Sequence, residues 1–234
     1  MAATADKPFM EGQVMKVMLD TVLYVHMPFE QKGGVLRFAQ FVRPDGKTVL
    51  PFFSDRAQAL EAAAGHMDVV PILGRNLFAL TQGATLMLDP NERGDCVFYP
   101  EELAALLAGG STGMAQPWQS DSPIRLTPAR DVPKPLINGL RSACASLSYI
   151  SAAYIAFAQW QDAIGAPPVL LVAIVTDKSE HEHAVRAISA ALQPHVRHLQ
   201  RAVDLTTIEL EKTNHPMIRK GRLVYRKDHP NNGD

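Results

Sequence analysis

The sequence lacks the features that mark several large protein classes. Its 234 residues include only two cysteines, Cys96 and Cys144, which are far apart and form no CxxC pair. This excludes a disulfide scaffold and a cysteine-rich zinc site, and it is typical of a reducing compartment. No stretch approaches the roughly 20 apolar residues of a membrane span. The first ten residues also lack the apolar core of a signal peptide, so we expect a cytoplasmic protein.

Charges of the two signs nearly balance over the whole chain. The formal net charge is −1, which argues against a globally basic nucleic-acid binder. Residues 1–110 carry 9 basic and 13 acidic side chains, a net charge of −4. Residues 111–234 carry 14 basic and 11 acidic side chains, a net charge of +3. Either the two halves complement each other, or the second half meets an anionic surface elsewhere.

The chain changes character over residues 109–123, where the sequence GGSTGMAQPWQSDSP is rich in glycine, serine and proline. Loss of periodicity together with this composition is typical of a linker. At roughly 150 residues per domain, the chain length fits one large domain or two small ones. We predict a first domain over residues 1–110, a linker over residues 111–123 and a second domain over residues 124–234.

Turn formers and hydrophobic spacing divide each half into short helices and strands. The turn at Pro44-Asp45-Gly46 joins two of these strands, so residues 35–53 are predicted to form a hairpin. Pro194 is expected to kink or restart the last helix. In the first half we expect helices over residues 8–19, 56–64, 75–81 and 100–107, and strands over residues 22–25, 35–42, 47–53, 69–73 and 84–88. In the second half we expect helices over residues 134–145 and 177–192, and strands over residues 124–126, 149–160, 169–176 and 203–210. This mixture predicts two small α+β domains rather than a parallel series of βαβ units.

Two short motifs resemble catalytic signatures but lack the context that the chemistry needs. Residues 109–113, GGSTG, match G-x-S-x-G, but a nucleophile elbow requires a strand before the serine, and here a helix precedes it. Residues 46–48, GKT, resemble the end of a P-loop, but Phe41 stands where the first glycine is required. We interpret the first motif as a flexible linker and the second as a hairpin turn.

Four histidines of the second half are the best candidates for metal ligands: His181, His183, His195 and His198. Pro194 separates the two pairs, and the H-E-x-x-H spacing of zinc enzymes is absent. We therefore interpret them as exposed helix histidines and expect neither a metal site nor a cofactor. Without a nucleophile–base pair, a metal set or a phosphate loop, the sequence predicts a protein that is not an enzyme.

Residues 212–227 form a segment with six basic side chains and no acidic one. Such a segment can bind an anionic partner, and arginine, tryptophan and tyrosine are favoured at the centres of protein interfaces. The predicted partner-binding residues are Trp160, Arg219, Arg222 and Tyr225. The alternative is that Trp160 belongs to the core and that the basic residues form a solvated tail.

Several segments resemble the SseB family. In the first half, residues 49–55 (VLPFFSD) match that family's "lPvFTs" segment, and residues 86–91 (LMLDPN) and 99–103 (YPEEL) match its "lNP…l…eel" ending. Asp89 stands where the family often has asparagine. In the second half, Leu136 and residues 152–156 (AAYIA), 169–175 (VLLVAIV) and 222–225 (RLVY) are similar to the SseB C-terminal domain. The resemblance touches most of the chain and implies the same two-domain layout.

The SseB resemblance implies a bacterial protein associated with enhanced serine sensitivity and loosely linked to secretion systems, with no catalytic residues to carry over. We expect a non-enzymatic protein-binding module whose partner is a secretion component or a cognate toxin. The chain could also form a homo-oligomer. The alternative is a sensor or enzyme for an amino acid or related metabolite. Nucleic-acid binding ranks third, because Tyr225 is the only aromatic residue in the basic segment.

Overall fold

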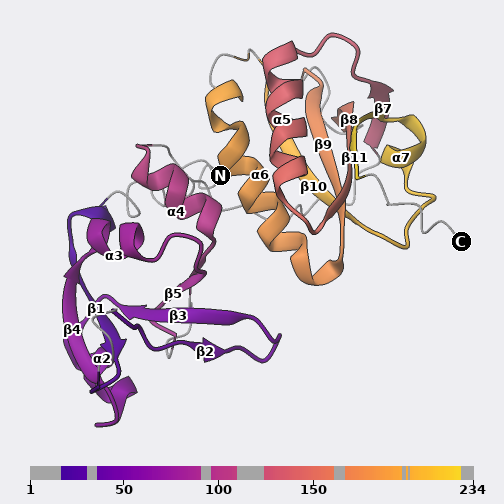
Figure 1. Ribbon diagram of the computed structural model, residues 1–234. Coiled ribbons are helices and arrows are strands. Elements are labelled where there is room, and N and C mark those ends of the chain that lie inside the picture. Colours follow the sequence, from indigo (N-terminus) through magenta and orange to yellow (C-terminus); the bar gives the residue numbers. More distant parts are fainter. Residues whose placement is uncertain are drawn as a thin grey trace, which may run out of the picture. The chain divides into compact units, whose positions relative to one another are not determined.

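The computed structural model describes residues 17–30, 36–90, 96–109, 124–160, 167–196, 199 and 201–227. The chain divides into two compact units, Met1–Gly113 and Met114–Asp234, and each unit has its own sheet (Figure 1). Both units mix helices with mainly antiparallel strands, which confirms the α+β fold class. The predicted linker and most of the predicted first helix lie outside the described residues, although residues 17–19 are helical.

The first unit is a mixed sheet with helices on both faces. Its strands are β1 (Val22–Met27), β2 (Phe41–Val42), β3 (Thr48–Phe53), β4 (Asp68–Leu73), β5 (Leu86–Leu88) and β6 (Cys96–Phe98). Its helices are α2 (Arg56–Ala63), α3 (Gly74–Leu80) and α4 (Pro100–Leu107). The strand order is β4-β1-β3-β5-β6, in which β3 and β5 are parallel and the other neighbours antiparallel.

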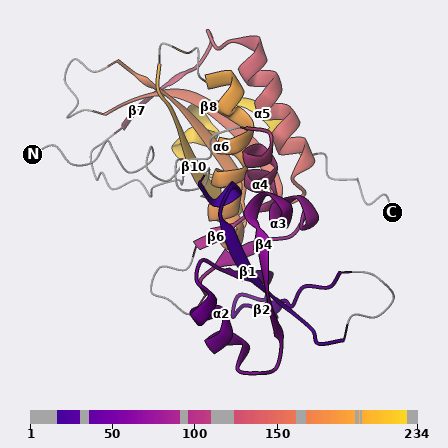
Figure 2. The same ribbon diagram turned by 90° about the vertical axis from the view of Figure 1, so that its left-hand side faces the viewer.

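Alternating residues of β3 divide the first unit into two apolar layers. Leu50 and Phe52 face α3 and α4, which lie together on one side of the sheet (Figure 2). Phe52 is fully buried, and its ring meets the ring of Phe78 edge-on at 6.0 Å. Val49 and Phe53 face the opposite side, where α2 packs against β1, β3 and β4. The period of two within β3 therefore places one core on each side of the sheet.

The predicted strand over residues 35–42 is wrong for most of its length. Only Phe41–Val42 pairs with β3, where it lies opposite Val49 and Thr48. Further along the same edge of β3, Phe52 and Phe53 already pair with β1. Because β1 occupies this edge, the hairpin partner cannot continue along it, and residues 36–40 form no strand. The predicted hairpin turn itself is confirmed: Gly46 adopts a positive φ of 81°, and Arg43 and Lys47 close the turn.

The second unit is a five-stranded sheet. Its strands are β7 (Ile124–Pro128), β8 (Ile150–Trp160), β9 (Val169–Thr176), β10 (Val203–Glu209) and β11 (Arg222–Arg226). Its helices are α5 (Lys134–Ser146), η1 (Lys178–Glu180), α6 (His181–Val196) and α7 (Pro216–Lys220). The order is β10-β9-β8-β11, and β7 pairs with the far end of the long strand β8. The β9–α6–β10 connection is one parallel βαβ unit within an otherwise antiparallel sheet.

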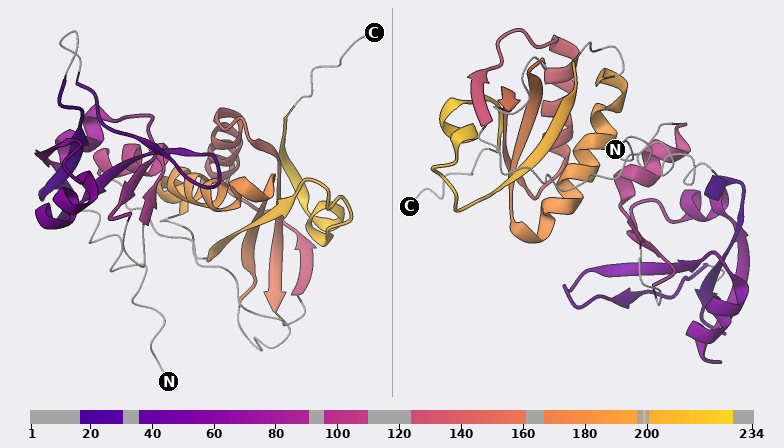
Figure 3. Two further views of the ribbon diagram at one scale, coloured as in Figure 1. Left: turned by 90° about the horizontal axis from the view of Figure 1, so that it is seen from below. Right: turned by 180° about the vertical axis from the view of Figure 1, so that it is seen from behind.

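Helices cover the two faces of the second sheet unequally. α5 and α6 pack on one face, against Ile155, Val172 and Ile174. The short helix α7 lies on the opposite face, where Met217 is almost fully buried (Figure 3). No helix in the described ranges is long and apolar enough to cross a membrane.

Three elements are absent from the sequence-based prediction, and the last long helix extends further than predicted. The sequence predicts neither β6 nor α7 nor β11, and it ends α6 at residue 192, whereas the helix continues through Pro194 to Val196. Most of residues 212–227 belong to α7 and β11, so this segment is a folded part of the second unit, while its basic side chains are exposed to solvent.

Candidate functional site

Four exposed cations lie at the end of α7 and on the adjoining edge strand β11. Arg219 and Lys220 form the last turn of α7, and Arg222 and Arg226 are the first and last residues of β11. We call these four residues the basic surface. In the part of the chain that the structure describes, none of the four forms an ion pair, and the Arg226 guanidinium donates a long hydrogen bond of 3.5 Å to the Tyr154 hydroxyl. The basic surface is thus an uncompensated patch of positive charge.

The turn between α7 and β11 requires a glycine. Gly221 donates its backbone N–H to the Met217 carbonyl at 2.8 Å. A Cβ atom at this position would collide with that same carbonyl oxygen. Only glycine allows this close approach, so Gly221 permits a tight turn in which β11 begins directly after α7. Lys220 and Arg222 therefore lie on either side of this turn.

The start of α7 is fixed by a histidine cap. His215 Nδ1 accepts a hydrogen bond from the backbone N–H of Met217 at 3.2 Å, and Pro216 occupies the first helical position. Burial, and secondarily the charge of Lys212, lower the pKa of His215. The lowered pKa favours the neutral form of the ring, which this cap requires.

β11 departs from simple alternation at a bulge between Leu223 and Tyr225. Val224 and Tyr225 both turn toward the core beneath α5, while Leu223 is 42% exposed on the other face. The register with β8 places Leu223 and Arg226 on the α7 face of the sheet, opposite Tyr154 and Ala152, and Arg222 on the α5 face, opposite Ile155.

The structure brings together only part of the predicted partner-binding set. Arg219 and Arg222 lie on adjoining elements, the end of α7 and the start of β11, and Tyr225 is close in sequence but packs partly into the core. Trp160 ends β8 opposite Ile124, five residues beyond the last pairing of β8 with β11. At about 3.3 Å per residue this is about 17 Å along the strand. Trp160 is therefore not part of the basic surface, and its side chain lies outside the described atoms.

The first unit carries a cavity of about 610 Å³ on the face of the sheet that α2 covers only in part. Its walls are mainly apolar and come from β1, the segment before β2, β3, α2 and β5. The lining residues are His26, Ala39, Gln40, Phe41, Arg43, Pro44, Pro51, Phe53, Ala62, Met67, Met87 and Pro90. Because these residues come from distant segments, no sequence motif indicates this cavity.

His26 is the buried polar residue of this cavity. Its Nε2 lies 2.8 Å from the carbonyl oxygen of Ala59, and its ring packs 4.8 Å from that of Phe53. A carbonyl oxygen can only accept, so Nε2 carries the hydrogen and Nδ1 of the neutral ring is an acceptor. This arrangement leaves Nδ1 able to bind an N–H or O–H group of a ligand.

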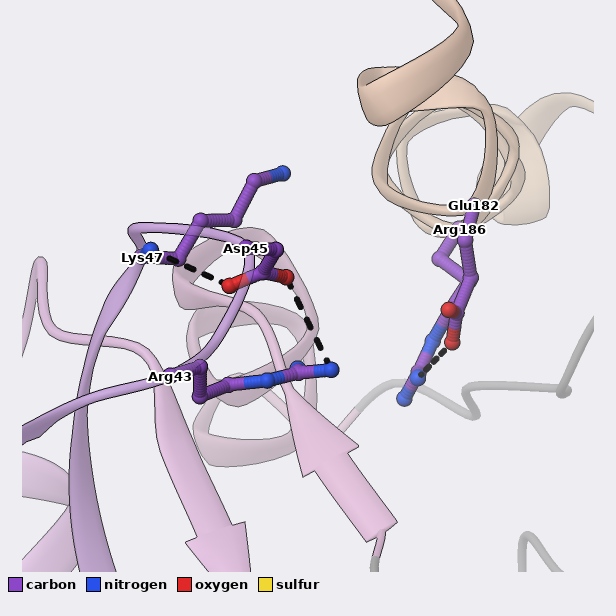
Figure 4. A network of polar contacts seen from close by, with 5 residues as sticks. All are labelled: Arg43, Asp45, Lys47, Glu182 and Arg186. Atoms are coloured by element: carbon purple, nitrogen blue, oxygen red, sulfur yellow. Dashed lines mark hydrogen bonds and ion pairs between the residues drawn. The ribbon is translucent and has the colours of Figure 1, made fainter.

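Arg43 at the edge of the cavity is held by the hairpin turn. Its guanidinium lies 3.7 Å from the Asp45 carboxylate, which also accepts the backbone N–H of Lys47 at 3.1 Å (Figure 4). Gly46 and Lys47 of the GKT motif belong to this turn, and Thr48 begins β3.

The candidate metal ligands His181, His183 and His195 are half-buried, so the expectation that they are exposed helix histidines is wrong for these three. His183 stacks on Tyr149 and lies 3.4 Å from Glu180, and the ring of His195 fits against Gly139 of α5. His198 lies outside the described residues. Nearby in α6, Arg186 pairs with Glu182 at 3.1 Å (Figure 4). Among the described side chains, no group of three or more His, Cys, Asp or Glu residues is arranged to hold a metal.

Comparisons with known proteins agree with this two-unit architecture. The SseB protein N-terminal domain matches residues 1–105, and the SseB protein C-terminal domain matches residues 118–227. No curated protein and no solved structure shows significant similarity to the chain. The two matched segments together span most of the sequence and fall in successive units. The chain therefore belongs to the SseB family and contains both of the domains that define it.

Proposed function

We propose that the chain is a non-enzymatic protein-binding module whose basic surface meets an acidic face of another protein. The observation that supports this proposal best is the group of four exposed cations on α7 and β11, which have no ion-pair partners among the described residues. The partner classes that we include are a secretion component and a cognate toxin.

Electrostatics gives this surface a defined role in binding. Cations clustered on adjoining elements raise the local potential, which attracts an acidic partner and speeds the encounter. An apolar side chain such as Leu223 adds contact area that the partner can bury. Exposed cations spread over a helix end and a neighbouring strand fit the face of a protein better than a single small substrate.

Paired affinity purification from the native host tests this proposal. The baits are the wild-type chain, the double variant Arg219→Glu with Arg222→Glu, and a control double variant Arg130→Glu with Lys134→Glu. The control reverses the same number of exposed charges elsewhere in the second unit. We expect a protein that wild type and control enrich and that the first double variant loses, with unchanged circular dichroism for all three baits.

A protein that binds all three baits equally would remove the basic surface from the interface. Turnover of a small substrate by the purified wild-type chain would contradict the non-enzymatic function itself.

The cavity of the first unit supports a second candidate function, a small-ligand sensor. Its volume of about 610 Å³ lies in the range of small-molecule sites, and Nδ1 of His26 offers one hydrogen-bond acceptor among apolar walls. A thermal-shift screen with amino acids and nucleotides would raise the melting temperature if one of them binds the native state. The variant Ala62→Phe fills the cavity and should abolish such a shift. Absence of any shift in the screen would count against this candidate.

A further inference from the structure

The sheet edges of the described residues differ in their protection against pairing with another chain. β2 and β6 are only two and three residues long, β4 contains Pro71, β7 ends at Pro128, and β11 carries its bulge. Short strands, prolines and bulges are devices that discourage edge pairing. β10 has seven residues, no proline and an uninterrupted register with β9. Among these edges, β10 is the one that lacks all three devices.

The backbone of β10 presents free hydrogen-bonding groups on its outer side. Leu170 of β9 donates its N–H to the Ala202 carbonyl at 3.0 Å, which fixes the phase of the parallel ladder. Alternate residues of a parallel strand bond to the same neighbour, so Asp204, Thr206 and Ile208 face β9. The N–H and C=O groups of Val203, Leu205 and Thr207 therefore point outward. No backbone group elsewhere in the described ranges bonds to them.

A groove runs beside this free edge. It measures about 360 Å³ and lies between α6 and β10. Its apolar lining includes Leu192 and Val196 from α6 and Val203 and Leu205 from β10. Since Val203 and Leu205 are two residues apart, they share the face of the strand that meets α6. A strand added to β10 would direct every second side chain into this groove.

Arg201 gives the groove a single charge. It is exposed, its guanidinium lies 4.2 Å from the centre of the Phe157 ring, and it is the one charged residue of the lining. The carboxylate of Asp204 lies on the opposite face of the strand, in register with Leu171. The groove therefore favours a partner with a negative charge at the Arg201 end.

We propose that β10 accepts an extended segment of a partner protein as an additional strand. Alternate apolar side chains of that segment occupy the groove between α6 and β10, and an Asp or Glu side chain pairs with Arg201. In strand addition, main-chain hydrogen bonds supply affinity and the side-chain pockets supply specificity. The inference rests on the proposed function in that the partner is a protein, but it uses a surface distinct from the basic surface.

A display library of random ten-residue peptides, selected against the full-length chain, tests this inference. We expect enriched peptides with apolar residues at alternate positions and an Asp or Glu at one end. Enriched peptides are then synthesised with acetylated and amidated ends, so that side chains supply the only carboxylates, and are titrated against variants.

Two variants with matched controls examine the backbone and the charge separately. Thr207→Pro removes one outward N–H without removing a bond to β9, and we expect it to weaken binding by at least about tenfold. Thr207→Val keeps that N–H and should bind within about twofold of wild type. Arg201→Glu should weaken acidic peptides, and replacing the peptide's acid by lysine should restore binding to this variant.

The outcomes that would overturn this inference differ from those that would overturn the proposed function. Peptides without the alternating pattern, or equal binding by Thr207→Pro, would overturn it. A wild-type dimer that Thr207→Pro dissociates, with no peptide enriched, would assign the edge to a second copy and overturn it as well. The variant Arg219→Glu with Arg222→Glu should bind the peptides normally, so failure of the basic surface would leave the β10 result intact.

Discussion

The carboxylate of Asp89 binds Ser54 twice, accepting its backbone N–H at 3.0 Å and its hydroxyl at 2.7 Å. These residues follow the parallel strands β5 and β3, so the contact ties together two chain segments that leave the sheet side by side. Asp89 also has a positive φ of 44°, which aspartate and asparagine tolerate better than other residues with a Cβ. Asp89 therefore has two roles: it adopts the positive φ of the turn, and its carboxylate links the ends of β5 and β3. We call this pair of hydrogen bonds the clamp.

Replacing Asp89 tests the importance of this clamp. Asp89→Ala removes both hydrogen bonds and should lower the free energy of unfolding by about 1–3 kcal/mol. Asp89→Asn keeps an acceptor oxygen and the tolerance of positive φ, so its loss should be clearly smaller. Urea unfolding followed by circular dichroism measures both variants. Equal losses would show that the carboxamide cannot replace the carboxylate.

Gly74 and Gly139 should differ strongly in how much stability is lost when each is replaced by alanine. A Cβ at Gly74 would collide with the backbone carbonyl of Met18, which cannot move aside, so Gly74→Ala should cost about 3 kcal/mol or more. A Cβ at Gly139 would meet the His195 ring at 2.6 Å, and that ring is a side chain that can rotate. Alanine also favours the helix, so Gly139→Ala should cost less than about 1 kcal/mol. Thermal unfolding that ranks the two variants in the reverse order would contradict this account.

The two cysteines should differ in reactivity. Burial raises the pKa of Cys144 to about 12, so very little thiolate exists at pH 8. In the variant Cys96→Ser, we expect no rapid reaction with a disulfide reagent in the native state and one thiol per chain after unfolding. Rapid stoichiometric labelling of the native variant would show that Cys144 is accessible and ionised.

The cap of α7 predicts a pH dependence. The pKa of His215 is lowered from its ordinary value of 6.5, so the native state binds this proton less tightly than the unfolded chain does. The contribution of His215 is fully present above about pH 6.5 and decreases as the pH falls from there through the folded-state pKa. Asparagine caps helices without titrating, so His215→Asn should reduce the loss of stability between pH 7.5 and 5.5. Identical pH profiles of wild type and variant would contradict the role of His215.

Much of the fold follows from local patterns in the sequence. The turn at residues 44–46 and the N-cap Asp55 are local signals, and the structure contains the predicted hairpin turn and α2. Asp55 accepts the backbone N–H groups of Ala57 and Gln58, as an N-cap should. Such signals need no information about distant residues, which is why they are predictable.

The elements that the sequence analysis did not predict are either very short or determined by contacts with distant parts of the chain. β11 shows no alternation because its bulge turns Val224 and Tyr225 to the same side, and α7 has only five residues. The wrongly predicted strand before Phe41 has strand composition, but β1 already pairs with the edge that it would need. The basic segment was thus recognisable by its charge, whereas the folded surface that displays Arg219 and Arg222 on adjoining elements was not.

The most direct test of the central claim is a titration of the full-length chain against the purified protein that the affinity experiment identifies, at low and high salt. The account predicts that wild-type affinity falls with added salt and that Arg219→Glu with Arg222→Glu binds at least about tenfold more weakly at low salt. It also predicts that this difference shrinks at high salt, where surface charges are screened. Equal affinity and equal salt dependence of the two proteins would contradict the claim that the basic surface binds the partner.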